Sequence, residues 1–261
     1  MKKRIQGIIL FALSIVLLLV VSSRVSPPER TETVDERERE RQDYVLVTPS
    51  PEPTPTPTPE PTSGIREILP DVSPTEWYLK LVNDIYILPQ TFAPNVVEVQ
   101  DGQYFDERAA DALNNMISAA EAEGYSVYIS VAYRPYRTQA TLFFGKASQI
   151  AWGGEVEYAD AEMMARKLVA YPGTSEHQLG LAVDLLDSKD TNKVAEEVEY
   201  MPLLRWLQAH CMEFGFIYRY PKNKQDITGW YEPWHFRYVG ESAAMYMAEN
   251  NLCLEEFIAL Y

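Results

Sequence analysis

The chain has little of several residue types on which whole classes of protein depend. Its 261 residues include only two cysteines, Cys211 and Cys253, and only three histidines. Two cysteines cannot supply a disulfide-dependent framework, and they leave open either one bridge or two buried thiols. No run of lysine and arginine is long enough to form a basic patch, and the formal net charge is −15 at pH 7. Such a surface repels phosphates, so no nucleic-acid partner is expected.

The first two dozen residues differ from the rest of the chain. Three basic residues at positions 2–4 precede an apolar run over 8–21, and Arg24 follows it. This pattern is typical of a secretory signal peptide or of a short signal anchor. No convincing cleavage site follows, so we favour an uncleaved anchor over residues 1–24, with the positive end inside. The chain is then a single-pass membrane protein with an extracellular domain, or a secreted protein if the segment is cleaved.

Residues 25–64 are predicted to form a disordered linker. The part up to about residue 43 mixes acidic residues and arginine with almost no apolar side chains, so it cannot bury enough surface to offset the ordering entropy. Proline then occupies every second position from Pro49 to Pro61. Such a run favours a stiff polyproline II spacer of about 3.1 Å per residue. We therefore expect the linker to hold a folded domain, residues 65–261, away from the membrane.

The folded part interleaves two hydrophobic patterns. Helical periodicity is seen over 106–124, 136–150, 157–170, 202–214 and 241–260. Alternation of apolar and polar residues, or short apolar runs, predicts strands over 125–131, 181–186, 216–220 and 235–239. The connections are too irregular for a doubly wound sheet. The expected fold class is α+β, with a small, mostly antiparallel sheet flanked by helices.

Two of the three histidines lie in short segments that also carry carboxylates. The first segment is Ser-Glu-His-Gln-Leu-Gly-Leu-Ala-Val-Asp at 175–184, and the second is Glu-Pro-Trp-His at 232–235. His177, Asp184 and His235 form the two-histidine, one-carboxylate ligand set of a catalytic zinc site. Each segment alone has an ordinary structural explanation. Their joint occurrence is what favours a zinc hydrolase.

The alternation of side chains suggests how these residues are arranged. Gly180, Ala182 and Asp184 are expected to share one face of a strand, where the two small residues leave room for a metal ion and a substrate backbone. His235 is expected to point to the face opposite its aromatic neighbours. Glu232 lies three residues before His235 and is predicted to be the general base that accepts a proton from water.

Three other polar residues have simpler explanations. Arg219 and Arg237 flank aromatic strands and are predicted to be structural partners of acidic residues. His210 lies in a predicted helix beside Trp206, so packing or surface exposure explains it better than metal binding.

Together, the two histidine segments resemble the signature of the LAS metallopeptidases, the family of lysostaphin, D-Ala-D-Ala peptidases and hedgehog-type domains. Within that family the chain is most similar to the D-alanyl-D-alanine carboxypeptidases of the vancomycin-resistance type. The resemblance covers about residues 100–240. The other matching segments are Tyr133-Arg134 with Gln139, Pro172 to His177, Trp206-Leu207, Gly215 to Pro221, Ile227 to Gly229 and Glu232 to Gly240.

The resemblance also implies roles for individual residues. The implied ligands of one zinc ion (Zn2+) are His177, Asp184 and His235. Glu232 matches the catalytic base, and Arg134 matches the arginine that polarises the scissile carbonyl and stabilises the oxyanion. The implied substrate contacts are Ser175, Gln139 and Tyr133. Pro135 and Leu179 depart from the residues usual in the family, which leaves the substrate preference open.

The expected function is that of a monomeric, zinc-dependent D,D-carboxypeptidase that removes the terminal D-alanine from peptidoglycan stem peptides. Two alternatives keep the same fold and metal: an L,D-carboxypeptidase and a peptidoglycan endopeptidase. An alternative of another class is a non-catalytic, zinc-stabilised cell-wall binding module. The presence of both Glu232 and Arg134 argues against that module, because binding alone requires neither residue.

Overall fold

The computed structural model describes residues 69–187 and 195–261. The predicted anchor over 1–24 and the predicted linker over 25–64 lie outside these ranges, so both stay predictions. In the part of the chain that is described, no helix combines the length and apolar character that crossing a bilayer requires.

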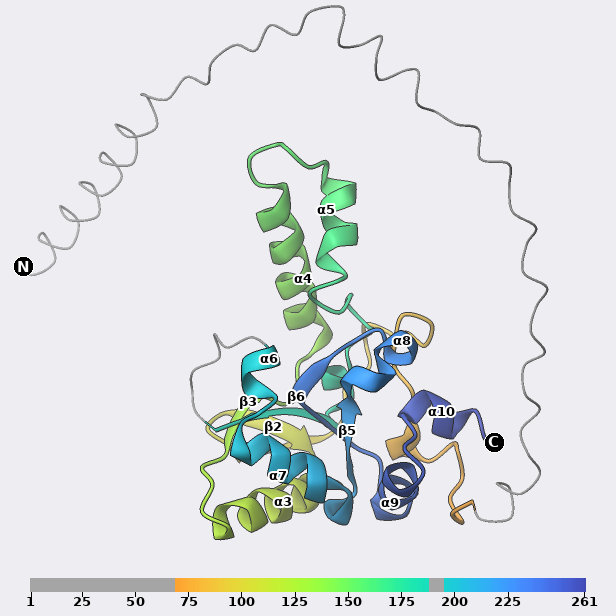
Figure 1. The fold of residues 1–261 in the computed structure, drawn as a ribbon. Coiled ribbons are helices and arrows are strands. Elements are labelled where there is room, and N and C mark those ends of the chain that lie inside the picture. The colour runs from red at the N-terminus through yellow and green to blue at the C-terminus, as the bar shows by residue number, and fades with distance from the viewer. Residues whose placement is uncertain (1–68, 188–194) are drawn as a thin grey trace, which may run out of the picture. The chain divides into compact units, whose positions relative to one another are not determined.

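The centre of the domain is a four-stranded sheet with the strand order β3-β4-β6-β5, shown in Figure 1. Its strands are β3 (Tyr128–Val131), β4 (Ala182–Leu186), β5 (Phe216–Tyr220) and β6 (Glu232–Tyr238). All three neighbouring pairs are antiparallel. A separate two-stranded ribbon, not predicted from the sequence, pairs β1 (Val96–Gln100) with β2 (Gln103–Asp106). The expected α+β class with a small antiparallel sheet is confirmed.

Helices surround this sheet on several sides. The helices of the described residues are α3 (Ala110–Ala122), α4 (Tyr136–Ala151), α5 (Tyr158–Ala165), α6 (Ala195–Val198), α7 (Pro202–His210), α8 (Gln225–Thr228), α9 (Glu241–Glu249) and α10 (Leu254–Ile258). The helix predicted over 241–260 is interrupted, because Asn251 adopts a left-handed conformation with φ of 51° between α9 and α10. The helix predicted over 202–214 ends at His210 and continues as a short 3-10 turn.

The hydrophobic core lies between the sheet and two helices, α3 and α7. One apolar cluster joins Leu113 of α3 and Leu207 of α7 to Val183 and Leu185 of β4 and to Phe236 of β6, all of them fully buried. Because successive strand residues face opposite sides, the residues between these core positions point away from the cluster. Burial of the apolar positions therefore fixes which strand residues face the other side of the sheet.

Helices α4 and α5 form a hairpin that projects away from the sheet (Figure 1). It has a small apolar core of its own, formed by Phe143, Ala147 and Ala165. The hairpin begins directly after the Tyr133-Arg134 pair, and the chain leaving it leads to Ser175. Its base therefore brings together two segments that the sequence singled out separately.

Both cysteines are free and buried, which resolves the alternative left open by the sequence. Burial raises the pKa of the Cys211 thiol to about 12 and that of the Cys253 thiol to about 11. Since the thiolate is the reactive form, we expect alkylation by iodoacetamide at pH 8 to be roughly a hundredfold or more slower than for a free cysteine. Mass spectrometry after alkylation checks this: modification of both thiols only after denaturation is expected, and rapid modification of the native protein would contradict it.

Candidate metal centre

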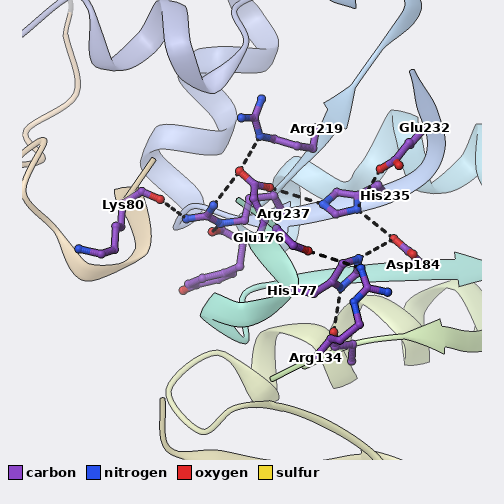
Figure 2. A network of polar contacts seen from close by, with 12 residues as sticks. Lys80, Arg134, Glu176, His177, Asp184, Arg219, Glu232, His235 and Arg237 are labelled. Carbon is purple, nitrogen blue, oxygen red and sulfur yellow. Dashed lines mark hydrogen bonds and ion pairs between the residues drawn. The ribbon is translucent and has the colours of Figure 1, made fainter. Parts of the chain in front are cut away.

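His177, Asp184 and His235 converge on one point beside the sheet (Figure 2). Each offers one ligand atom, and these atoms all lie within 4.8 Å of one another. The two imidazole rings have centroids 4.9 Å apart. Asp184 Oδ1 lies 3.4 Å from His177 Nε2 and 3.0 Å from His235 Nδ1. The structure thus brings together the three residues predicted to be ligands, in a cluster that could hold a metal ion.

The sheet register explains why two of these residues meet. Asp184 of β4 is directly opposite His235 of β6 in the antiparallel pair. Directly opposed residues have Cβ atoms about 4.5–5.5 Å apart and project to the same face. Their neighbours Val183 and Phe236 are buried in the core on the other face. The predicted separation of His235 from its neighbour Phe236 therefore follows from the strand geometry.

His177 reaches the cluster from a one-turn 3-10 helix, η3 (Glu176–Leu179), that precedes β4. Gly180 ends this turn with φ of 73°, and its amide donates to the His177 carbonyl at 3.2 Å. A Cβ at Gly180 would lie 3.1 Å from Pro94. Ala182 lies opposite Arg237. The expectation that Gly180 shares the strand face of Asp184 was therefore wrong, because Gly180 closes a turn before β4, whereas Ala182 does share that face.

The two imidazoles present different nitrogens to the cluster. His177 Nδ1 lies 2.8 Å from the Ala132 carbonyl, which can only accept, so Nδ1 carries the hydrogen and Nε2 faces Asp184. His235 is turned the other way, with Nδ1 facing both Asp184 at 3.0 Å and Glu232 at 3.4 Å. Each ring thus has one nitrogen directed at the common point.

The unsatisfied atoms of the cluster fit a cation. Within residues 69–187 and 195–261, Asp184 Oδ1 and His235 Nδ1, which face each other in the cluster, are buried without a hydrogen bond. Buried polar groups without partners are costly, and close approach without hydrogen-bond geometry is expected for lone pairs that converge on an ion. Two imidazole nitrogens and one carboxylate oxygen are also the donor set of many catalytic zinc sites.

The charges in the cluster depend on each other. Burial alone would raise the pKa of Asp184, but the neighbouring His177 and His235 hold it below its usual range. Burial alone would lower the pKa of His235, but contacts with Asp184 and Glu176 raise it to about 9. For His177, burial dominates and lowers the pKa. The negative charge of Asp184 is thus favoured, which suits a site for a cation.

Glu232 begins β6 and lies beside the cluster with a side chain that is partly exposed. Its Oε2 is 3.4 Å from His235 Nδ1. Burial raises the pKa of Glu232 to about 7, with Asp184 and Glu176 also raising it and His235 and Arg134 opposing them. A carboxyl group with a pKa near neutrality is well suited to accept a proton and then release it.

Arg134 approaches the cluster from the other side, at the end of the segment that follows β3. Its backbone amide donates to the His177 carbonyl at 3.1 Å, and its Nη2 donates to Ser175 Oγ at 3.4 Å. Burial lowers the pKa of its guanidinium, while Asp184 and Glu232 oppose that shift. An arginine remains charged in such surroundings, so a fixed cation lies next to the two acidic groups.

A cavity of about 220 Å³ opens over these side chains. It is lined by Arg134, Leu142, Leu168, Val169, Ala170, Thr174, Ser175, Glu176, His177, Asp184, Tyr220, Trp230, Glu232, Trp234 and His235. The aromatic side chains and the hairpin leucines in this wall were not predicted from the sequence. No ligand motif marks them, because they reach the cavity from α4, from the chain after α5 and from the chain around β5 and β6.

Four residues singled out from the sequence do not line this cavity. Gln139 is buried in α4, where its amide donates to the Ala170 carbonyl at 2.6 Å. The Tyr133 backbone amide donates to the Tyr104 carbonyl at 2.8 Å. The substrate contacts assigned to both residues stay predictions. Leu179 packs in the core, and Pro135 precedes α4, so neither changes the polarity of the cavity wall.

The two buried arginines pair with carboxylates, as predicted. Arg219 Nε and Arg237 Nη1 lie 2.8 Å and 2.9 Å from Glu176 Oε1. Arg219 also makes two hydrogen bonds to Glu255. Glu176 itself was missed in the sequence, although it stands between Ser175 and His177 in the first histidine segment. The prediction for His210 agrees with its partly exposed contact with Glu213.

Comparison with known proteins places this site in a family. The family model described as VanY, D-alanyl-D-alanine carboxypeptidase, matches residues 102–241. A D-alanyl-D-alanine carboxypeptidase of Enterococcus faecalis (strain ATCC 700802 / V583) is 38% identical over 184 residues, which cover 70% of this chain and 66% of that protein.

Two solved structures are similar over most of the described domain. One is a mutant of the vancomycin resistance D,D-pentapeptidase VanY from a VanB-type resistance cassette, in complex with Zn(II). Its sequence is 37% identical and its TM-score is 0.60, and the match covers 70% of this chain and 99% of that chain. The other is the LdcB LD-carboxypeptidase: it is 38% identical with a TM-score of 0.60, covering 69% of this chain and 84% of that chain.

Proposed function

The chain belongs to the VanY family of D-alanyl-D-alanine carboxypeptidases, and we propose that it is a zinc-dependent D,D-carboxypeptidase that removes the terminal D-alanine from peptidoglycan stem peptides. Membership confirms the resemblance to LAS metallopeptidases and shows that the chain is a carboxypeptidase. The Zn(II) bound in the similar VanY structure supports zinc as the metal of this chain. The observation that carries the proposal is the cavity in which Arg134 and Glu232 flank the cluster of two histidines and one aspartate.

We assign one zinc ion to His177, Asp184 and His235. When bound, such an ion supplies Lewis-acid chemistry, because it polarises a carbonyl group and lowers the pKa of water toward about 7. The unpaired buried atoms of Asp184 and His235 support the assignment.

The remaining chemistry is done by two side chains. Glu232 accepts a proton from the water whose oxygen attacks the scissile carbonyl carbon, and it then gives a proton to the nitrogen of the departing D-alanine as the C–N bond breaks. Arg134 donates hydrogen bonds to the carbonyl oxygen as that oxygen gains negative charge. Both groups are fixed in place: Glu232 belongs to β6, and the backbone amide of Arg134 donates a hydrogen bond to the His177 carbonyl.

Substrate specificity is tested with stem peptides of defined length. The purified protein is incubated with a pentapeptide stem that ends in D-Ala-D-Ala and with the tetrapeptide stem, and the products are identified by mass. We expect loss of one alanine from the pentapeptide alone, inhibition by a chelator, and recovery with zinc. Shortening of the tetrapeptide alone would favour the L,D-carboxypeptidase, the alternative that the similarity to LdcB supports. Release of monomers from a cross-linked dimer would indicate an endopeptidase, and zinc binding without hydrolysis a binding module.

The surroundings of the enzyme also belong to this proposal. We infer that the segment over 1–24 anchors a monomeric enzyme in the cell membrane, with the catalytic domain over 65–261 outside, where the stem peptides are found. Fractionation of cells into membrane, medium and cytosol checks the anchor, and we expect the protein in the membrane fraction. If all of the protein is recovered in the medium instead, the segment is cleaved.

The role of Arg134 gives a specific expectation for its replacement by lysine. Arg134→Lys keeps the positive charge but loses the planar fork of donors, so we expect kcat on the pentapeptide to fall by about 10²–10³-fold with zinc content unchanged. Steady-state kinetics and metal analysis provide the measurement. Arg137→Lys, an exposed position nearby in the first turn of α4, is the matched control. An unchanged kcat in Arg134→Lys would exclude this residue from oxyanion stabilisation.

A further inference from the structure

Glu176 is a fully buried carboxylate whose two oxygens face different partners (Figure 2). Oε1 accepts from Arg219 Nε at 2.8 Å and lies 2.9 Å from Arg237 Nη1. Oε2 faces His235 Nε2 at 3.5 Å. Among the described residues, neither Glu176 Oε2 nor His235 Nε2 has a hydrogen-bond partner. Two unsatisfied polar atoms are thus buried face to face, at the outer edge of hydrogen-bond distance.

Glu176 lies on the side of the His235 ring that faces away from Asp184. The Nδ1 of His235 is directed at Asp184, and the opposite ring nitrogen is directed at Glu176. His177 is oriented in a similar way, but with the roles of the two ring nitrogens exchanged. Its Nδ1 lies 2.8 Å from the Ala132 carbonyl, and its Nε2 faces Asp184. Histidines that bind metals commonly donate their second ring hydrogen to a carbonyl or a carboxylate, which fixes the tautomer and the ring orientation.

Glu176 is itself held rigidly between two buried arginines, Arg219 and Arg237, which both lie on its Oε1. Arg219 is fixed by two hydrogen bonds to Glu255 of α10, at 2.8 Å and 2.6 Å. Arg237 Nη2 donates to the backbone carbonyls of residues 78 and 80, each at 3.0 Å. The carboxylate therefore remains an acceptor at a fixed position.

We propose that Glu176 is the positioning residue of the metal centre: it accepts the Nε2 hydrogen of His235 and so directs the Nδ1 lone pair of that histidine at the ion. This inference rests on the proposed zinc site and assigns Glu176 no contact with the ion or the substrate. Without an acceptor at Nε2, the neutral ring can carry its hydrogen on Nδ1, which cannot then bind a metal. Loss of such a partner typically weakens metal affinity by about 10–100-fold.

The first test uses the unaltered, zinc-loaded full chain. Nitrogen-15 NMR of the histidine side chains, of which the sequence has only three, distinguishes metal-bound from protonated ring nitrogens. We expect His235 to bind zinc through Nδ1 and to carry a slowly exchanging hydrogen on Nε2. Binding through Nε2, or an Nε2 hydrogen that exchanges as fast as that of the exposed His210, would overturn the proposal without any variant.

The second test compares two variants of the same ionic network. In Glu176→Gln the single amide oxygen is needed by the donors of Arg219 and Arg237, so the amide NH2 is left facing His235 Nε2 and the acceptor there is lost. Glu255→Gln alters the other carboxylate that pairs with Arg219, and no contact joins Glu255 to His235 in the described residues. Zinc affinity is measured by competition with a chromogenic chelator. We expect the dissociation constant to rise about 10–100-fold in Glu176→Gln and to change little in Glu255→Gln. The Nε2 hydrogen resonance of His235 should shift only in Glu176→Gln. Equal affinities for the parent and Glu176→Gln would overturn the proposal.

The same series separates this inference from the proposed function. If the parent binds zinc and hydrolyses the pentapeptide while Glu176→Gln retains the parent's affinity, only the positioning role fails. If the parent binds no zinc, the metal site and the positioning role fail together.

Discussion

Replacing Glu232 with glutamine lowers kcat on the pentapeptide by about 10²–10⁴-fold and leaves zinc bound. Glutamine keeps the size of the side chain but cannot accept a proton, so water attacks unassisted and the departing amine receives no proton. The cluster of His177, Asp184 and His235 keeps its ligand atoms in this variant. Single-turnover kinetics together with metal analysis measure both halves of the expectation.

The control for this variant is Glu249→Gln, an exposed glutamate at the end of α9, which should retain the parent's kcat. A zinc-loaded Glu232→Gln enzyme that hydrolyses the pentapeptide at the parent's rate would remove Glu232 as the base. Loss of zinc from that variant would instead identify the Glu232 carboxylate as a ligand. Zinc content is measured for this reason, because Glu232 Oε2 lies only 3.4 Å from His235 Nδ1.

Replacing His177 with alanine removes a ligand, so zinc content, activity and zinc-dependent stability are expected to fall together. A ligand that binds only the folded state stabilises it by about 2.7 kcal/mol when present at 100 times its Kd. Metal binding to this centre contributes to folding in the same way. We therefore expect zinc to raise the Tm of the parent and to leave the Tm of His177→Ala unchanged, with no measurable hydrolysis.

His210→Ala is the matched control, because this histidine is partly exposed and contacts Glu213 and the ring of Trp206, away from the cluster. It should keep the zinc-dependent rise in Tm. Full zinc occupancy in His177→Ala, measured by elemental analysis, would show that this imidazole is not a ligand.

The sequence predicted those parts of the site that are encoded locally. Asp184 and His235 lie in strands with clear alternation, and burial of Val183 and Phe236 forces both polar side chains to the same face. Once the two strands pair in register, the two ligands must meet. The antiparallel sheet and the convergence of the histidine segments were therefore accessible from residue patterns alone.

Features that depend on long-range packing were not accessible. The ion pairs of Glu176 could not be predicted, because its partners Arg219 and Arg237 lie far away in the sequence, in β5 and β6. The ribbon of β1 and β2 has a bulge between Glu98 and Gln100 that disturbs its alternation. Gly180 was assigned to the strand because small and apolar residues alternate over 180–184, whereas its positive φ ends a turn. A one-dimensional pattern does not distinguish these two reasons for glycine.

The hairpin of α4 and α5 and the chain just after it line part of the cavity without supplying its reactive groups. Arg134 and Ser175 lie at the base of the hairpin, joined by a hydrogen bond of 3.4 Å, while Leu142 of α4 and Leu168, just after α5, line part of the cavity. The reactive groups are anchored to the sheet and to η3, outside the arms. Changes in the arms can consequently reshape the entrance for a peptide without moving a single reactive atom, so selectivity and chemistry can diverge independently within one domain.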